Sequence, residues 1–499
     1  MKQNLFNSIK LSKPKSNSFD LSHDVKLSAS MGNLTPILTL ECVPGDRFKI
    51  GCESLIRFAP LVAPVMHRMD VTMHYFFVPN RILWSNWEKF ITDANSGLVS
   101  PVMSVYEGWT AAQKKFMDYM GVPPNGNGAA PVPLVSALPF AAYQCIYNEY
   151  YRDQNLISPV NYHLTDGSNN ANEAALLTMR KRAWEHDYFT AALPFAQKGS
   201  AVDIPLGDVN IPYLPIATIP NQYLVGSVSN LNTSTAPAPL ANNTAYSQGG
   251  NYPVDPTTIN DLRRAFKLQE WLEKNARGGT RYIESILSHF GVKSSDKRLQ
   301  RPEYITGVKS PVIVSEVLNT TGESSGLPQG NMAGHGISIS SGNSGSYFCE
   351  EHGYIIGIMS IMPKTAYQQG IPRTYLKRDT LDYFFPSFAN IGEQEVKNIE
   401  LYAYDAGQEG TFGYVPRYSE YKYMPSRVAG DFRTTLDYWH LGRIFSTPPA
   451  LNGTFVSCDP ANTTRIFAVE DGTDPLYCHV YNKIQAVRPM PKFGNPSGL

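Results

Sequence analysis

The sequence predicts a mainly β protein, built as one sandwich that long insertions interrupt, and three observations lead to that prediction. Aromatic residues reach 12% of the chain while charged residues reach only 17%, a composition typical of packed sheets rather than of helical bundles. Glycine (38 residues) and proline (37 residues) are plentiful, which favours long irregular connections. The clearest strand patterns lie near the two ends of the 499-residue chain, and helical and loop patterns fill its middle.

The N-terminal residues 1–30 form a polar arm in which lysines outnumber aspartates. Termini of this kind are usually solvated tails, and the alternative is an arm that faces a nucleic acid or a neighbouring subunit. Under that alternative, the candidate nucleic-acid contacts are Lys2, Lys10, Lys13 and Lys15. The next residues, 34–43, are predicted to form a strand that ends at the turn Pro44-Gly45-Asp46.

The stretch MHRMDVTMHYFFVPNRILW, residues 66–84, contains three residue types that bind metals, His67, Asp70 and His74. Its odd positions are mostly apolar and its even positions mostly polar, the alternation of a half-buried strand. In a strand Asp70 and His74 stand roughly 13 Å apart and His67 points to the opposite face. Because three ligands must converge on one ion, we predict no metal site, with Asp70 and His74 facing away from the sandwich core.

Helical patterns follow this strand. Trp84, Trp87 and Ile91 share one helical face, and residues 143–150 repeat the same spacing with tyrosines and isoleucine. Two further helices are predicted at 260–277 and 281–290, each ending at glycine, and core packing is expected to bury their apolar stripes. The intervening segment 222–256 is rich in Asn, Ser, Thr, Ala, Pro and Gly with almost no charge, so we expect a surface excursion there.

From about residue 305 onward the chain returns to strand patterns. The best of them are SPVIVSEVL, YFCEEHGYIIGIMSIM, RIFAV and LYCHVYNKIQAV. Residues 354–362 are apolar at both alternating positions, which predicts a strand buried on both faces.

The chain offers little for catalysis or for a cofactor. Six cysteines lie far apart without any C-x-x-C, so reduced thiols are the default expectation, and no phosphate-binding loop or zinc motif occurs. The sequence GNSGS around Ser344 resembles the nucleophile loop of chymotrypsin-like proteases, but no histidine carries the matching context. Basic residues alternate with aromatic ones in RTYLKRDTLDYFFP and RYSEYKYMPSR, which could stack single-stranded bases; interface or loop aromatics are the simpler interpretation.

Charge and hydropathy limit the partners. The 43 Lys and Arg balance the 43 Asp and Glu, so any nucleic-acid contact must be local or shared with a basic protein. The N-terminus lacks the apolar segment of a secretory signal and no apolar run approaches the ~18 residues of a membrane span. We therefore expect a protein that is made in the cytoplasm and stays soluble.

Several segments closely resemble one family, the major capsid proteins of the Microviridae, and look nearest to its gokushovirus-like branch. The matching phrases run in order from about residue 19 to 494 and include FDLSHDVKLSASMGNLTPILTLECVPGDRFKI, SLIRFAPLVAPVMHRMDVTMHYFFVPNRILWSNWEKFIT, PQGNMAGHGIS, GYIIGIMSIMPKTAYQQGI, YVPRYSEYKYMPSRVAGDFR, WHLGRIFSTPPALN and NKIQAVRPMPKFG.

The resemblance implies a single eight-stranded antiparallel jelly-roll of the viral capsid type, with large loop insertions that contain short helices. It implies a basic arm at 1–30, a jelly-roll domain at 31–499 and a helical and loop insertion at about 95–300. About sixty copies would form a T=1 icosahedral shell around a circular single-stranded DNA genome, with no enzymatic activity, metal or cofactor. The implied partners are further copies of the chain, the genome, a small basic DNA-associated protein, a minor or pilot protein and a host receptor. The implied location is the virion, after synthesis in the host bacterial cytoplasm and without membrane insertion.

Interface cores are rich in aromatic residues and arginine, so the expected residues of a subunit interface or a loop core are Trp84, Trp87, Tyr421, Tyr423 and Arg427. In gokushovirus-like members one long insertion forms threefold protrusions thought to meet the host, and 222–256 is the best positional match. The host-facing candidates in it are Asn230, Asn232, Thr235, Asn242, Asn243 and Tyr246. The alternative functions are a serine protease that uses Ser344 and a carbohydrate-binding jelly-roll spike.

Overall fold

The computed structural model describes residues 15–105, 108–123, 134–200, 202, 259–320, 329–342, 344–405, 407, 409–469 and 472–493. The chain divides into two compact units, one formed by residues 197–277 and the other by the residues before and after them. Helix α6 (Ile259–Gly278) lies in the smaller unit except for its last residue, and every other element discussed below lies in the larger one. The candidate contacts Lys2, Lys10 and Lys13 and the whole segment 222–256 lie outside the described residues.

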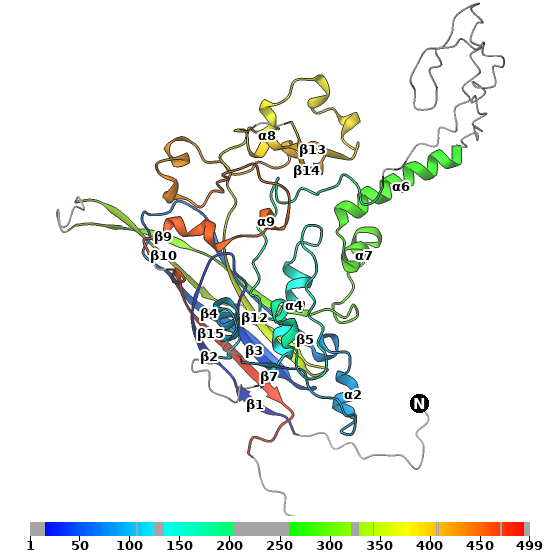
Figure 1. Ribbon diagram of the computed structural model, residues 1–499, viewed down its shortest axis with the longest axis vertical. Coiled ribbons are helices and arrows are strands. Elements are labelled where there is room, and N and C mark those ends of the chain that lie inside the picture. Colours follow the sequence, from blue (N-terminus) through cyan, green and yellow to red (C-terminus); the bar gives the residue numbers. More distant parts are fainter. Residues whose placement is uncertain are drawn as a thin grey trace, which may run out of the picture. The chain divides into compact units, whose positions relative to one another are not determined.

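Two antiparallel sheets form the centre of the larger unit (Figure 1). A seven-stranded sheet has the order β1-β15-β4-β10-β9, with β2 also paired to β15 and β11 also paired to β4. A four-stranded sheet has the order β3-β12-β5-β8. The bounds of these strands are β1 Asn17–Asp20, β2 His23–Ala29, β3 Thr35–Cys42, β4 Arg47–Phe58, β5 Met69–Pro79, β8 Glu303–Pro311, β9 Ile313–Leu318, β10 Met332–Ser341, β11 Gly345–Phe348, β12 Gly353–Pro363 and β15 Leu476–Arg488.

One apolar core lies between the two sheets. Phe48 of the seven-stranded sheet and Val71 and Met359 of the four-stranded sheet are buried in the same cluster. The hydroxyl of Tyr75 donates a buried hydrogen bond of 2.7 Å to Asn482 on the opposite sheet. The chain is therefore a mainly β protein with a β-sandwich, as the sequence predicted.

The outer face of the four-stranded sheet is also buried, because the first insertion, between β5 and β8, covers it (Figure 1). Phe76, Val78 and Ile356 pack there against helical residues such as Phe140 and Tyr143. All residues of β12 are buried, which confirms the strand predicted to be buried on both faces. For β5 the half-buried prediction is wrong, since none of its even positions is fully exposed and Phe76 and Val78 among them pack against helices.

Apart from α6, the helices of the first insertion are short. They are α1 Asn80–Leu83, α2 Trp87–Thr92, α3 Ala111–Tyr119, α4 Leu138–Ile146, a π-helix η1 Tyr147–Tyr151, α5 Glu173–Leu176 and α7 Tyr282–Phe290, with a small hairpin of β6 Val102–Ser104 and β7 Leu134–Ser136. The helices predicted around 143–150, at 260–277 and at 281–290 are confirmed. The single helical face predicted for Trp84, Trp87 and Ile91 is wrong, because Trp84 has an extended backbone that separates α1 from α2.

The apolar stripe of α7 is a second difference from the sequence-based expectation. None of its residues is buried, and Tyr282 and Phe290 are 72% and 78% exposed. An amphipathic pattern predicts a helix but does not say what covers its apolar side.

The second insertion, between β12 and β15, has a small core that it shares with Tyr188, Phe189 and Ala192 of the first insertion. It contains β13 Glu393–Lys397 paired with β14 Thr411–Pro416, the helices α8 Asn398–Leu401 and α9 Gly453–Val456, and seven short 3-10 segments, Arg373–Tyr375, Thr380–Asp382, Pro386–Phe388, Ser419–Tyr421, Gly430–Arg433, Asp437–Trp439 and Pro460–Ile466. The strand predicted at RIFAV is wrong, since its first two residues end the last 3-10 segment and the rest forms an isolated bridge, Leu61 to Phe467, instead of a strand.

Part of the predicted N-terminal arm belongs to the larger sheet. Residues 17–29 form β1 and β2, and both strands pair with β15. Backbone pairing to a central strand explains why these polar residues are ordered as part of the sheet. Lys15 is exposed and lies two residues before β1.

Candidate functional site

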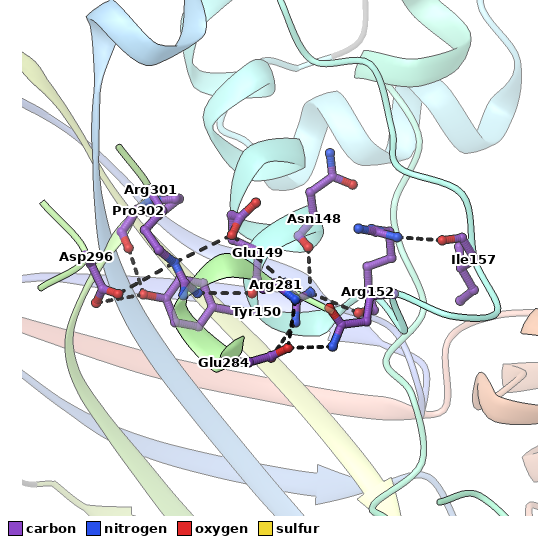
Figure 2. Close-up of polar contacts among 11 residues, drawn as sticks. Asn148, Glu149, Tyr150, Arg152, Ile157, Arg281, Glu284, Asp296, Arg301 and Pro302 are labelled. Carbon is purple, nitrogen blue, oxygen red and sulfur yellow. Dashed lines mark hydrogen bonds and ion pairs between the residues drawn. The ribbon is translucent and has the colours of Figure 1, made fainter. Parts of the chain in front are cut away.

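Two arginines hold the returning end of the first insertion against the last turn of η1 (Figure 2). Arg281, just before α7, donates to the carbonyl oxygens of Asn148 at 2.8 Å and Arg152 at 3.1 Å. Arg301, just before β8, donates to the carbonyl oxygen of Glu149 at 3.2 Å. The last carbonyl groups of a helix lack hydrogen-bond donors within the helix and carry partial negative charge. The two guanidinium groups supply these donors and therefore stabilise the end of η1.

Carboxylates surround the same two arginines. Arg281 lies 3.3 Å from Glu284, and Arg301 lies 3.5 Å from Glu149 and 3.6 Å from Asp296. We call these five residues the insertion clamp. All five residues lie in the first insertion, so the clamp ties the returning end of this insertion to η1 and has the chemistry of a structural ion-pair network.

The tyrosine beside the clamp belongs to the same network (Figure 2). The ring centroid of Tyr150 lies 4.7 Å from the guanidinium carbon of Arg301, and its hydroxyl donates to Asp296 and to the carbonyl oxygen of Pro302. Burial, together with the nearby Asp296 carboxylate, raises the pKa of Tyr150, so it stays a neutral donor.

The second insertion brings together the two segments in which basic and aromatic residues alternate. The ring of Phe384 lies 5.1 Å from that of Tyr418 and 6.2 Å from that of Tyr421. The hydroxyl of Tyr418 donates to the carbonyl oxygen of Tyr383, and Arg417 donates to that of Leu381. The sequence singled out both segments, and only the fold makes them one surface.

A buried ion pair fixes this surface from below. The Lys377 ammonium lies 3.4 Å from Glu420, with side chains 5% and 6% exposed, and 3.8 Å from the ring centroid of Tyr421. Gln394 donates to the same glutamate at 2.7 Å. A lysine that is paired and stacked in this way positions the ring rather than reaching out to a phosphate.

The outer side of this surface remains exposed. Tyr383, Phe384, Tyr421, Tyr423 and Met424 are between 48% and 94% exposed, and we call them the aromatic patch. At roughly 200 Å² per aromatic side chain, the four half-exposed rings leave about 400 Å² of mostly apolar surface. Monomeric proteins rarely expose more than a few hundred Å² in one such area, so the patch is a candidate contact surface.

The five candidate interface residues separate into two groups. Trp84 is buried inside the subunit, where its ring nitrogen donates to Asp166, and Trp87 is partly buried in the same cluster. Both therefore lie in a loop core. Tyr421 and Tyr423 belong to the aromatic patch, and Arg427 is exposed while its backbone pairs with Tyr367.

The three metal-binding residue types of the 66–84 stretch have other partners. Asp70 forms ion pairs with Lys309 at 3.0 Å and Lys364 at 3.1 Å, and His67 bonds the carbonyl oxygen of Lys364. His74 shares a hydrogen bond of 2.7 Å with the hydroxyl of Tyr151. Asp70 and His74 lie on the face away from the sandwich core, as predicted, and no group of three potential ligands occurs within the described residues.

Burial dominates the titration of both histidines. It lowers the pKa of His67 to about 4 and, with the nearby Arg182 charge, the pKa of His74 to about 4. Both are therefore neutral at pH 7.

Ser344 is exposed in the connection between β10 and β11. The upstream histidines considered as its base, His67 and His74, bond to Lys364 and Tyr151 instead. A catalytic serine needs a base within hydrogen-bond reach, so the geometry gives the protease hypothesis no support.

No described helix is both long and apolar enough to cross a membrane.

Comparisons with known proteins agree along nearly the whole chain. A family model described as "Capsid protein (F protein)" matches residues 7–497. The capsid protein VP1 of Bdellovibrio phage phiMH2K is 35% identical, with 96% of this chain and 95% of that protein covered. The capsid proteins VP1 of Chlamydia phage 1 (34% identical, 99% and 97% covered) and Spiroplasma virus 4 (30% identical, 95% and 94% covered) are similar as well. The chain therefore belongs to the F-protein family of bacteriophage capsid proteins, in the gokushovirus-like branch of the Microviridae.

Proposed function

We propose that the chain, a structural capsid protein, assembles with about sixty copies of itself into a closed T=1 icosahedral shell around a circular single-stranded DNA genome. The observation that carries this proposal is the family match over residues 7–497, which includes both insertions as well as the sandwich. Closed shells built from one chain need surfaces that are self-complementary under rotation.

The order of the strands supports an eight-stranded jelly-roll as the building block of this shell. Four strands, β2-β15-β4-β10, face four others, β3-β12-β5-β8. Along the chain these eight strands alternate between the sheets except at the step from β5 to β8, which is the connection pattern of a jelly-roll. In this proposal β9 and β11 extend the larger sheet.

The aromatic patch and Arg427 form part of a contact between copies. Residues of this kind are enriched in interface cores, and about 400 Å² from the patch would be half of the ~800 Å² that each partner of a standard interface buries. The fixed Lys377–Glu420 pair below Tyr421 supports this role, because pre-positioned rings lose little entropy on binding.

Electron microscopy of the purified chain and of the double variant Tyr421→Ala/Tyr423→Ala tests this function. We expect uniform closed particles from the wild type and unassembled subunits from the variant. Tyr477→Ala, which removes a comparably exposed tyrosine from a different surface, is the control and should still assemble. Normal particles from the double variant would exclude the aromatic patch from the contact, and no particles from the wild type under any assembly condition would refute the shell.

The remaining proposed partners are a small basic DNA-associated protein, a minor or pilot protein and a host surface receptor. The chain is made in the host cytoplasm and acts in the virion. We assign the receptor contact to residues 222–256. Deleting 226–250 should leave particles intact and reduce their attachment to host cells, as measured by co-sedimentation. Loss of assembly would instead make this segment a clamp between subunits.

A further inference from the structure

The outer face of the seven-stranded sheet is exposed, unlike that of the four-stranded sheet. Along β15, residues alternate between buried and outward positions, and the outward ones include Tyr477, Tyr481 and Lys483. The neighbouring strand β4 alternates in the same way. We call the outward positions of β2, β15, β4, β10 and β11 the open face. β15 and β4 run side by side along it (Figure 1).

Cations outnumber carboxylates on the open face. Its exposed cations are Lys26, Arg47, Lys49, Arg57 and Lys483, and its carboxylates are Asp24 and Glu53, to which the edge strand β1 adds Asp20 opposite Gln485. Asp24 lies 2.8 Å from His479. Within the described part of the chain none of the five cations takes part in an ion pair. A chain with zero net charge thus concentrates free positive charge on one sheet surface.

The strand register gathers three of these cations at one end of the sheet. Lys49 lies opposite Gln485, and Lys483 lies opposite Gly51, so the two lysines are diagonal neighbours. Arg47 is two residues from Lys49 on the same face. Such neighbours stand about 7 Å apart, so the three side chains form a continuous basic row. Lys15 precedes β1, which pairs with this end of β15.

Aromatic rings stand beside the arginines of the same face. Arg57 is paired in register with Tyr477, and Arg47 is paired with Phe348, whose ring centroid lies 5.5 Å from the guanidinium carbon. Tyr477 and Phe348 are 48% and 47% exposed. Exposed rings next to cations are the elements by which single strands are bound without sequence preference, bases stacking on the rings and phosphates meeting the cations.

We propose that the open face binds single-stranded DNA, with Arg47, Lys49 and Lys483 on the phosphates and Phe348 and Tyr477 stacking bases. The combination of unpaired cations with exposed rings favours this occupant over a second copy of the chain, because a single strand supplies both phosphates for the cations and bases for the rings. The proposal rests on the proposed function, since it assigns the surface at which the enclosed genome meets the shell.

Salt-dependent binding of a labelled oligothymidylate to the full chain tests the phosphate contacts. The triple variant Arg47→Ala/Lys49→Ala/Lys483→Ala should bind more weakly at about 50 mM salt. Its slope of log affinity against log salt should be shallower by roughly 2, at about 0.7 for each lost contact. The control variant Lys89→Ala/Lys293→Ala/Arg298→Ala removes the same charge from exposed positions in the first insertion and should keep the wild-type slope. Equal slopes in both variants would overturn the proposal.

Stacking is tested separately by the double variant Phe348→Ala/Tyr477→Ala. We expect at least roughly thirtyfold weaker binding of oligothymidylate and unchanged binding of an abasic deoxyribose phosphate oligomer, which keeps the phosphates and lacks the bases. Equal losses for both probes would overturn the stacking assignment.

Particle formation by the same variants distinguishes this proposal from the proposed function. Particles of normal size with reduced DNA content support both. Particles with normal DNA content refute the open face as the genome contact and leave the shell standing. Loss of assembly in the triple variant alone would make the open face a contact between subunits and refute the proposal, whereas a wild type that binds DNA but never assembles would refute only the shell.

Discussion

The two sheets of the sandwich share one core but differ in what meets their outer faces. On the four-stranded sheet the first insertion covers the outward side of β5, where Phe76 contacts Tyr150 and Tyr151. On the seven-stranded sheet the outward positions of β4 and β15 remain exposed and carry cations and rings. The same strand geometry therefore supports a packed interior on one side and a surface for a partner on the other.

The two outer faces should contribute differently to the free energy of folding. Each apolar side chain buried under the first insertion contributes about 1.5–3 kcal/mol to stability, so the covered side should respond to mutation through folding. Side chains on the open face add little to folding, and their mutation should change binding instead. The insertion clamp belongs to the covered side, because it holds the cover in place.

The largest expected effect is on the covered side. Phe76→Ala should lower the free energy of unfolding of the unassembled subunit by about 3–5 kcal/mol, because it leaves a cavity among buried rings. Phe348→Ala on the open face makes the same chemical change and should cost less than about 1 kcal/mol. Urea denaturation midpoints measure both, and similar losses in the two variants would show that the faces do not differ in this way.

A pH-dependent effect should follow, also on the covered side. Burial lowers the pKa of His74 to about 4 in the folded chain, against about 6.5 when unfolded. The unfolded chain binds the proton first as the pH falls, so stability is full above pH 6.5 and declines as the pH falls to about 4, by on the order of 3 kcal/mol for this group. His74→Gln should flatten that decline in urea titrations at several pH values. If the variant shows the same decline of stability with pH as the wild type, His74 is not the group responsible for it.

A smaller loss is expected at the insertion clamp. Arg281→Ala removes the donors to the carbonyl oxygens of Asn148 and Arg152 and should cost about 2 kcal/mol, since hydrogen bonds from charged groups contribute about 1.5–3 kcal/mol. Arg281→Lys keeps the positive charge but lacks the planar guanidinium group, so its loss of unfolding free energy should lie between those of the wild type and Arg281→Ala. The rate of backbone hydrogen exchange in η1 should rise from the wild type to Arg281→Lys and again to Arg281→Ala. If all three proteins exchange equally, the clamp does not hold the cover.

The smallest effect on stability should come from Glu53→Gln on the open face. Glu53 is exposed, so the free energy of unfolding should change by less than about 0.5 kcal/mol. Removing a carboxylate among free cations should still raise the affinity for oligothymidylate at low salt, because it removes a repulsive charge. Lower or unchanged affinity would place the bound strand away from the centre of β4.

Much of the local structure followed from the sequence. The turn at Pro44-Gly45-Asp46 is present, with Gly45 at φ 95° and Asp46 accepting from the backbone of Val43. The strand at 354–362 and the helices ending at Gly278 and Gly291 also occur as predicted. These features depend on neighbouring residues, on backbone preferences and on hydrophobic period, all of which a sequence contains.

The predictions that failed concern contacts between distant segments. For Trp84 the sequence left open a subunit interface or a loop core, and the residue is buried inside the subunit because the first insertion folds back over β5. The even positions of β5 looked half exposed, yet helices 60 and more residues later in the chain cover them. The residues next to a side chain in the sequence do not indicate which distant segments pack against it in the fold.

By itself the sequence determined a mainly β capsid protein, with Asp70 and His74 on the face of their strand away from the sandwich core, because alternation and spacing act over a few residues and the family phrases extend along the chain. Only the tertiary structure decided which sheet is covered, which basic and aromatic segments meet, and which cations stay free. Those outcomes depend on strand order, register and the path of two long insertions, which bring residues hundreds of positions apart into contact.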